Sequence, residues 1–380
     1  MPVDKFPSLT YNILSVMKII RNYLLKELVP PFLLSLIIST FILTAGNIIQ
    51  MADLIINKGV NAFQMFRLVG LLMPSLLIFT IPISLLSSVL LGFARLSNDN
   101  EIIALRASGV SIFRITAPVL MVGLIISLIS IPFNYKIMPE SSFRARRLVK
   151  EIGVTKPTAL IEPGIFIKVF KNYVIFIYDM KGNKLKHIRI YQPQENGPTR
   201  TLVAQTGEII SIPGEDKVKI KLTNGIADEV SPEDPNVLYK LAFKNYYLTL
   251  DLKDALQKQT VEKKAREMTL DELRTRIKKF KEENIDTTPL EIEIHNKVSL
   301  AFSNLIFVLL AIPIGIKTQR REKSINFGMA LMVFLVYWLL MLGGVACVIP
   351  KFVPPWLGVW FPNLIFGLVA VILFSRILKR

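Results

Sequence analysis

The sequence predicts a membrane α-helical protein with six membrane-spanning helices and a β-rich domain inserted between the third and the fourth. Of its 380 residues, 52% are hydrophobic and only 20% are charged, and the apolar residues come in long blocks. Blocks of about 20 apolar residues span a bilayer as helices, because the backbone in lipid must satisfy its own hydrogen bonds. Between two such blocks, residues 135–295 hold 28 of the 46 Lys and Arg and 23 of the 29 Asp and Glu.

The first part of the chain, residues 17–134, is predicted to contain a surface helix followed by three spans. Over Lys18–Glu27, basic and apolar residues mix at helical spacing, which is typical of a helix that lies on a membrane. The apolar run that follows is longer than that of a signal peptide and has no small-residue cleavage site, so we expect a retained span. The expected spans are Val29–Ile49, Leu68–Phe93 and Ile115–Phe133.

Residues 135–295 are predicted to form a soluble domain of antiparallel strands, either a sandwich or an open jelly roll. Short runs of β-branched and aromatic residues alternate here with Gly, Pro and Asn. After the strands, Thr269 and Glu272 have the spacing of a capping box, which predicts the start of a helix. The expected strands are Gly164–Lys171, Tyr173–Tyr178, Leu185–Tyr191, Thr201–Gln205, Glu208–Ile212, Val218–Thr223 and Leu241–Leu250.

The last part, residues 296–380, is predicted to hold the spans Val298–Ile316, Ile325–Ile349 and Leu357–Ile377. Six spans put both termini on one side, and the short segments on that side carry 14 Lys and Arg. The short segments on the other side carry four: Lys58, Arg67, Lys297 and Lys351. The positive-inside bias therefore predicts cytoplasmic termini in the inner membrane and a periplasmic β-rich domain.

Few residues have the pattern of a catalytic or cofactor site, and we expect neither. The net charge of +17 is concentrated beside the apolar blocks, which favours contact with membrane lipids over nucleic acid. The single cysteine, Cys347, forms no internal disulfide, and no P-loop is present. Glu291 and His295 stand four residues apart on a predicted helix. They fit a shared metal or proton, but an ion pair or a solvated face is simpler, so no metal site is predicted.

The segment Asn98–Ser111, between the second and third spans, predicts a short amphipathic helix on the cytoplasmic face. Asn98 or Asp99 is suited to cap its N-terminus, and Glu101 stands in the first turn. Ile102, Ile103 and Leu105 give the helix an apolar side, and Gly109 ends it. From the residues alone, this is either a loop helix resting on lipid or a docking helix for a cytoplasmic partner.

At this segment the chain resembles the LptF/LptG (YjgP/YjgQ) family of lipopolysaccharide export permeases. The family shows an acidic residue, a small residue and then Arg-Ala-x-Gly-x-Ser, which correspond here to Glu101, Ala104 and Arg106–Ser111. The resemblance covers nearly the whole chain from Met17 and rests on the order of features rather than on one motif. The other matching features are Pro82 in the second span, Met138-Pro139-Glu140 and Met268–Leu273.

The resemblance implies a permease subunit that extracts lipopolysaccharide from the inner membrane and passes it toward the outer membrane. The implied partners are an ABC ATPase dimer that uses the ATP, a second homologous permease and a periplasmic β-jellyroll bridge protein. Spans one and five would form lateral gates. The resemblance assigns Glu101, Ala104, Arg106 and Gly109 to ATPase coupling. Of the two paired permeases, we favour the LptF-like one.

The lipid contacts depart from the family pattern. Some members have basic residues near the end of the first span, suited to lipid phosphates, whereas Asn47 and Gln50 stand there in this chain. Lys58 and Arg67 are the candidates to contact phosphates instead. The simpler interpretation is that both side chains only reach to the membrane surface.

Two other functional classes remain open at this point. One is a membrane subunit of another ABC-type lipid or lipoprotein exporter, although those proteins usually carry their large domain after the first span. The other is a membrane-bound enzyme or sensor, which neither a catalytic constellation nor a cytoplasmic output domain supports.

Overall fold

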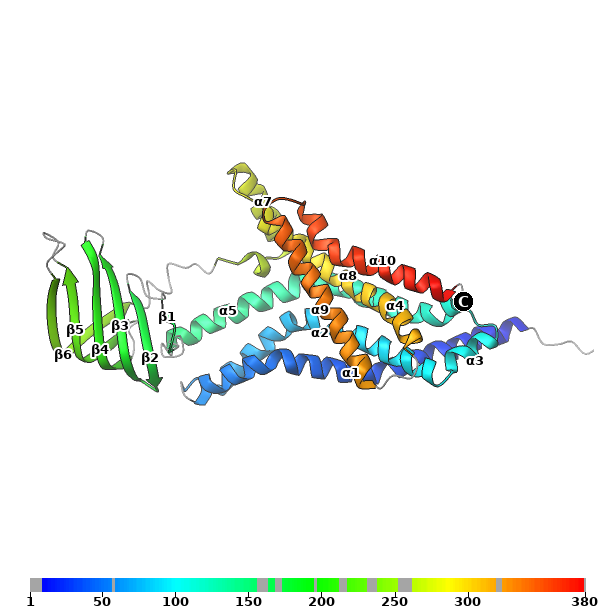
Figure 1. Cartoon of the computed structure of the whole chain (residues 1–380), viewed down its shortest axis with the longest axis horizontal. Coiled ribbons are helices and arrows are strands. Elements are labelled where there is room, and N and C mark those ends of the chain that lie inside the picture. Colours follow the sequence, from blue (N-terminus) through cyan, green and yellow to red (C-terminus); the bar gives the residue numbers. More distant parts are fainter. Residues whose placement is uncertain are drawn as a thin grey trace, which may run out of the picture. The chain divides into compact units, whose positions relative to one another are not determined.

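Six helices in the described part of the chain are long and apolar enough to cross a membrane, which confirms the predicted fold class (Figure 1). The computed structural model describes residues 9–56, 59–155, 163–167, 173–194, 197–211, 217–230, 238–251, 262–318 and 323–378. A six-stranded antiparallel sheet lies in sequence between the third and fourth of these helices. The six are α1 (Leu9–Ile56), α2 (Ala62–Asn98), α4 (Ile112–Pro132), α8 (Thr288–Lys317), α9 (Lys323–Val348) and α10 (Pro355–Leu378).

The predicted surface helix and the first span are parts of one helix. α1 continues through Pro30 and Pro31, although proline has no backbone N–H to donate. Neighbouring helices supply hydrogen bonds at such points in membrane proteins. Next to the two prolines, although not at the carbonyls that they leave unpaired, the Ser88 hydroxyl of α2 donates to the Leu28 carbonyl at 2.6 Å.

The helix of the third span does not end at Phe133, where the predicted span ended. α4 leads directly into a π-helical turn, η1 (Phe133–Ile137), and then into α5 (Met138–Thr155). The wider turn comes just before Pro139, which cannot donate to the preceding turn, so the chain stays helical past the proline. Eighteen residues that were predicted to belong to the soluble domain therefore extend the third span as α5.

The helical core is built around α8, which packs against α4 and α10, while α9 packs against α10. Phe93, Phe307 and Tyr337 are almost fully buried in its largest cluster. Tyr337 donates to Asn363 at 3.1 Å, and Asn363 donates to the Ser299 hydroxyl at 2.9 Å. Hydrogen bonds of this kind join helices in lipid, where apolar contact alone gives little preference for one partner.

The strands form one sheet in sequence order, so each strand pairs antiparallel with the next. The turn predicted at Lys181-Gly182-Asn183 is present, with Gly182 at φ 61°. The predicted run Thr201–Gln205 and the described part of the run Glu208–Ile212 belong to the single strand β4, and Ile212 lies outside the described residues. The predicted join at Lys171-Asn172 lies outside the described residues. The strands, called the β-domain below, are β1 (Phe166–Ile167), β2 (Val174–Lys181), β3 (Lys184–Gln194), β4 (Gly197–Ser211), β5 (Lys217–Val230) and β6 (Leu238–Asp251).

One row of residues interrupts the pairing across five strands. It consists of Tyr178, His187, Gln205, Asn224 and Lys244, which stand opposite one another but are missing from the ladders on both sides of them. His187 and Asn224 have φ values of 50° and 56°, in the left-handed region. Backbone in this region breaks the alternation of a strand, so the row marks a bend line in the sheet.

The bend line changes which residues of a strand face the core. On β3, Ile188 and Ile190 are buried on one side of the line, and Leu185 is buried on the other. Strict alternation would place Leu185 and Ile188 on opposite faces. Both nevertheless belong to the same apolar cluster, so the sheet directs apolar side chains from both halves into one core.

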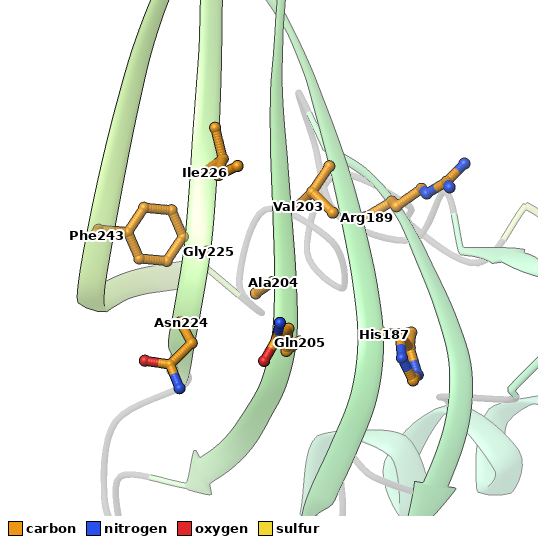
Figure 2. Close-up of a pocket in the computed structure, with 9 residues that line it drawn as sticks. All are labelled: His187, Arg189, Val203, Ala204, Gln205, Asn224, Gly225, Ile226 and Phe243. Carbon is orange, nitrogen blue, oxygen red and sulfur yellow. The ribbon is translucent and has the colours of Figure 1, made fainter.

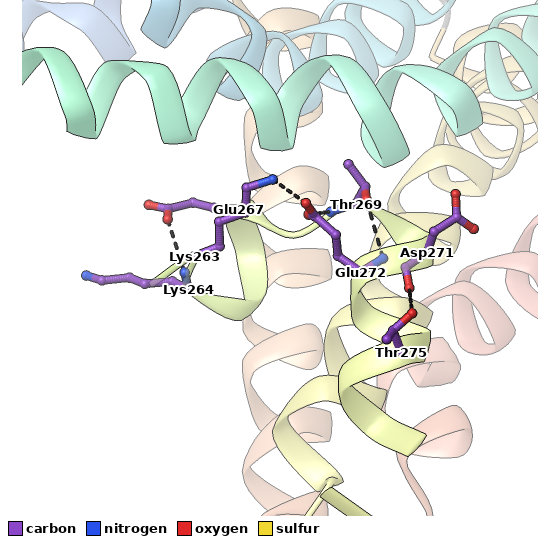
Figure 3. A network of polar contacts seen from close by, with 7 residues as sticks. All are labelled: Lys263, Lys264, Glu267, Thr269, Asp271, Glu272 and Thr275. Carbon is purple, nitrogen blue, oxygen red and sulfur yellow. Dashed lines mark hydrogen bonds and ion pairs between the residues drawn. The ribbon is translucent and has the colours of Figure 1, made fainter. Parts of the chain in front are cut away.

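The helix predicted from the capping box is present as α7 (Leu270–Glu282), preceded by a short turn, η3 (Ala265–Glu267). Figure 3 shows Thr269 and Glu272 in the predicted reciprocal arrangement, with Thr269 N donating to Glu272 at 2.9 Å. Lys263 also contacts the Glu272 carboxylate. Partial burial by itself raises the pKa of Glu272, but these hydrogen bonds outweigh it and hold that pKa below its usual value.

The β-domain and the helices α3, α4 and α7–α10 belong to two different compact units. Each unit has its own apolar cluster.

Candidate functional site

A short helix, α3 (Glu101–Ala107), joins α2 to α4 as predicted. Asn100 precedes it with φ 57°, and Gly109 follows it with φ 86°. Left-handed residues at both ends reverse the chain within a few positions, and glycine does so without the penalty of a side chain. Ser111 then caps α4 by accepting a hydrogen bond from Arg114 N.

The prediction that Asn98 or Asp99 caps α3 is wrong. α2 extends through Asn98, and Asn100 occupies the N-cap position without a side-chain cap bond. The Asp99 carboxylate instead lies 3.5 Å from Arg95 on the last turn of α2. The Asp99 carboxylate therefore pairs with the Arg95 guanidinium and does not cap α3.

α3 has one face against the helices and one face turned outward. Ile102 is 4% exposed and belongs to the helical core, and Leu105 packs against the same cluster. Ala104, Arg106 and Gly109 are exposed. Ile102 and Leu105 therefore fix the helix to its own protein, whereas Ile103, predicted to share their apolar side, is 54% exposed. Three of the four predicted coupling residues also lie on the free surface.

The fourth predicted coupling residue, Glu101, is tied to α1. The Tyr23 hydroxyl lies 3.0 and 2.9 Å from the two carboxylate oxygens of Glu101. Beside it, Arg95 bridges Asp99 and Glu27, another residue of α1. Tyr23 and Glu27 are separated from their partners by 78 and 68 residues, so no local sequence signal pointed to them.

These contacts join α3 to the first span. Glu101 links α3 to α1 through Tyr23, and the chain itself links α3 to α2. The exposed face of α3 and its contact with α1 fit the docking role predicted for this helix, which stays a prediction.

The predicted phosphate contacts are less well defined. Lys58 lies outside the described residues. Arg67 is exposed on the first turns of α2, between the exposed Phe66 and the buried Leu68. A cation beside exposed apolar side chains fits either interpretation of this residue.

In the pair Glu291 and His295, the Glu291 carboxylate has an ion-pair partner and a hydrogen-bond donor of its own. Glu291 lies 3.3 Å from Lys281 and accepts a hydrogen bond from Thr287. Among the described residues, no three His, Cys, Asp or Glu side chains are grouped so that they could hold a metal ion.

The β-domain has a pocket of about 470 Å³ at the bend line, which the sequence did not indicate. Figure 2 shows His187, Gln205 and Asn224 along this line on three neighbouring strands. The Phe243 ring lies over Gly225, where an added Cβ would come within 2.7 Å of the ring. The pocket thus combines an aromatic and aliphatic wall with polar side chains; its remaining members are Arg189, Val203, Ala204 and Ile226.

The family model for the lipopolysaccharide export system permease LptF/LptG matches residues 22–376 of this chain. The chain belongs to the LptF/LptG permease family. The match covers the six membrane helices, α3 and the inserted β-domain together. The resemblance seen in the sequence is thereby confirmed.

Relatives of this LptF/LptG permease share its length as well as its sequence. An uncharacterized protein of Rickettsia prowazekii, RP871, is 24% identical over 313 residues, which cover 81% of this chain and 84% of the relative. The lipopolysaccharide export system permease protein LptF of Escherichia coli K12 is 20% identical over 360 residues, covering 93% and 94% of the two chains. The LptF of Shigella flexneri matches to the same extent.

Membership of the LptF/LptG family makes the chain a multi-pass permease of an ABC transporter and implies partnership within an Lpt transporter. It does not test the individual site residues. The roles of Glu101, Ala104, Arg106, Gly109, Lys58 and Arg67 remain predictions, to which the structure adds Tyr23 and Glu27.

Proposed function

We propose that this permease extracts lipopolysaccharide from the inner membrane and passes it to a periplasmic bridge, driven by a partner ABC ATPase dimer. The proposal takes the LptF-like role of the two paired permeases, in keeping with the LptF relatives. The observation that carries it is α3, a helix fixed to the bundle by Ile102 and open to solvent at Arg106. The chain has no P-loop of its own, so the energy has to enter through such a contact.

The outward faces of α1 and α9 support pairing with a second homologous permease. Only 17% and 22% of their most apolar stretches are buried, against 72% in α2. Their exposed residues are large and apolar, including Ile37 and Phe41 on α1 and Met332 and Leu339 on α9. Surfaces of this kind suit either a partner helix or acyl chains, which is what a lateral gate for a lipid requires.

The β-domain offers two features for handing a lipid onward. Among the described strands, β6 pairs on one side only, and its 14 residues form a long edge that a strand of a β-jellyroll bridge protein can extend. The pocket of Figure 2 is lined by Arg189 as well as by Val203 and Ile226. A cation beside an apolar wall is suited to a phosphorylated lipid.

We propose that both termini and α3 face the cytoplasm and that the β-domain faces the periplasm, on the basis of the charge bias. With Cys347 replaced by serine, a cysteine at Asn183 in the exposed turn between β2 and β3 is expected to react with a membrane-impermeant maleimide in intact spheroplasts. A cysteine at Ala107 on α3 is expected to react only after lysis. The reverse pattern would overturn the orientation.

The function is tested first by purification. The tagged chain, extracted in mild detergent, is expected to bring down an ABC ATPase and a second six-span permease that mass spectrometry identifies. The purified complex is expected to hydrolyse ATP faster when lipopolysaccharide is added. A chain that purifies alone, under conditions in which another ABC transporter stays assembled, would contradict the proposal.

A further inference from the structure

A buried charged pair stands at the start of the fourth span. The Lys297 side chain is 3% exposed, and its Nζ lies 3.6 Å from Oε1 of Glu293, one helical turn earlier on α8. Removing such a charge from water costs several kcal/mol unless partners compensate it. By its position in the sequence, Lys297 belongs to a short external segment between the β-rich domain and the fourth span, where burial is not expected.

Lys297 holds two segments that are far apart in sequence. Its ammonium donates to the backbone carbonyl of Arg266 at 3.2 Å and lies 3.4 Å from the carbonyl of Asn134. The Asn134 side chain donates in return to the Lys297 carbonyl at 2.9 Å. Asn134 lies in η1, just before α5 carries the chain to the β-domain, and Arg266 lies in η3, just after the chain returns. One ammonium thus binds both connectors of the inserted domain.

The two connectors are stiff where they meet Lys297. The first is a continuous helix through η1 and α5. The second contains the capping box of Thr269 with Glu272, preceded by a hydrogen bond that Lys264 N donates to the Glu267 carboxylate at 3.1 Å (Figure 3). Segments whose backbone donors are satisfied in this way move as units, so a displacement at Lys297 is transmitted rather than absorbed.

The same junction contacts the helix that leads to α3. The Arg266 guanidinium lies over the Phe79 ring of α2 at 5.8 Å, and Phe79 packs edge-to-face on Trp338 of α9 at 5.1 Å. A cavity of about 180 Å³ adjoins these side chains and includes Asn296, whose buried Oδ1 has no hydrogen-bond partner among the described residues. Packing that leaves free space and an unsatisfied acceptor permits a second arrangement of these groups.

We propose that Lys297, together with Glu293 and Asn134, is the positioning junction that couples movement of the membrane helices to the two connectors of the β-domain. Movement of α3 reaches Arg266 through α2 and Phe79, and Lys297 passes it to both connectors at once. The inference rests on the proposed function, because it assigns the junction to the delivery of lipid rather than to ATP hydrolysis.

The test uses the whole transporter complex in proteoliposomes containing lipopolysaccharide. A photoreactive benzoylphenylalanine at Val203 reports lipid that reaches the β-domain pocket, and phosphate release reports ATP hydrolysis. The double variant Glu293→Gln/Lys297→Met removes both charges, so that neither is left uncompensated. The matched control Asp286→Asn/Lys351→Met removes an exposed ion pair of 3.7 Å near the same end of α8.

The double variant is expected to keep its ATPase rate within about twofold of the wild-type rate. Its yield of ATP-dependent lipid adduct is expected to fall about tenfold, which is the scale of a typical coupling energy. The control pair is expected to change neither. Asn134→Ala, which retains both charges, is expected to lower the adduct in the same direction and serves if the double variant does not assemble. An unchanged ratio of adduct to ATP hydrolysis in the variant that assembles would overturn the junction. Wild-type complex without an ATP-dependent adduct would instead overturn the proposed function, and this inference with it.

Discussion

The variant Arg106→Glu is expected to lose the ATPase partner during purification and to lose lipopolysaccharide-stimulated ATP hydrolysis. Arg106 is exposed on the outward face of α3, while Ile102 holds the helix on the core. Reversing a charge at the centre of a docking surface creates a like-charge contact, which lowers affinity at least about tenfold. Co-purification followed by quantitative mass spectrometry measures the loss directly.

The matched control is Arg114→Glu, which reverses another exposed arginine on the first turn of α4. It is expected to retain the partner. Glu101→Gln keeps a hydrogen-bond acceptor for Tyr23 but removes the charge, whereas Glu101→Ala removes both. If Glu101 acts through its charge, the two variants lose the ATPase to the same extent. Normal partner binding in Arg106→Glu and Glu101→Ala would show that α3 is not the coupling helix.

Gly344→Val is expected to destabilise the membrane bundle strongly. Gly344 on α9 faces Gly358 on α10 so closely that a Cβ at Gly344 would overlap the Gly358 carbonyl, and a Cβ at Gly358 would lie 2.7 Å from the Gly344 carbonyl. Small residues let helices approach in lipid, and forcing extra atoms into such a contact costs about 1–3 kcal/mol or more. The apparent Tm in mild detergent is expected to fall. It is measured from the fraction of the protein that stays monodisperse after heating.

The neighbouring glycine supplies the control for this prediction. Gly343 is one residue earlier on α9, and a Cβ added there meets nothing within 4 Å. Gly343→Val has the same change in volume and helix propensity, so it isolates the effect of the α9–α10 contact. Equal loss of stability in both variants would mean that propensity, rather than the close approach, explains the result.

The sequence by itself determined the number and order of the membrane spans and the strand-rich type of the inserted domain. A long apolar run specifies a span because the backbone in lipid must satisfy its own hydrogen bonds. A helix does this within its own segment, so the sequence of that segment is enough to predict it. The same holds for the capping box at Thr269 and Glu272, whose partners are three residues apart. The position of α3 and the turn at Gly109 were predictable for this reason as well.

Boundaries were less predictable where two local preferences competed. The predicted surface helix was separate from the first span and the predicted third span ended at Phe133, but the helices continue through Pro30 and through Pro139. Asn224-Gly225 resembles a hairpin turn, yet both residues lie inside β5 on the bend line. In each case contacts with neighbouring segments stabilise the conformation that local preference disfavours.

Only the tertiary structure decided which polar groups meet. Tyr23 reaches Glu101, and Lys297 reaches Asn134 and Arg266, across separations that no periodicity reports. Burial changes the role of such a group. The sequence shows Lys297 as one more basic residue beside an apolar block. In the fold, its ammonium connects three segments. A charge in water has little preference for one partner, but a buried charge must find its partners, and the fold alone supplies them.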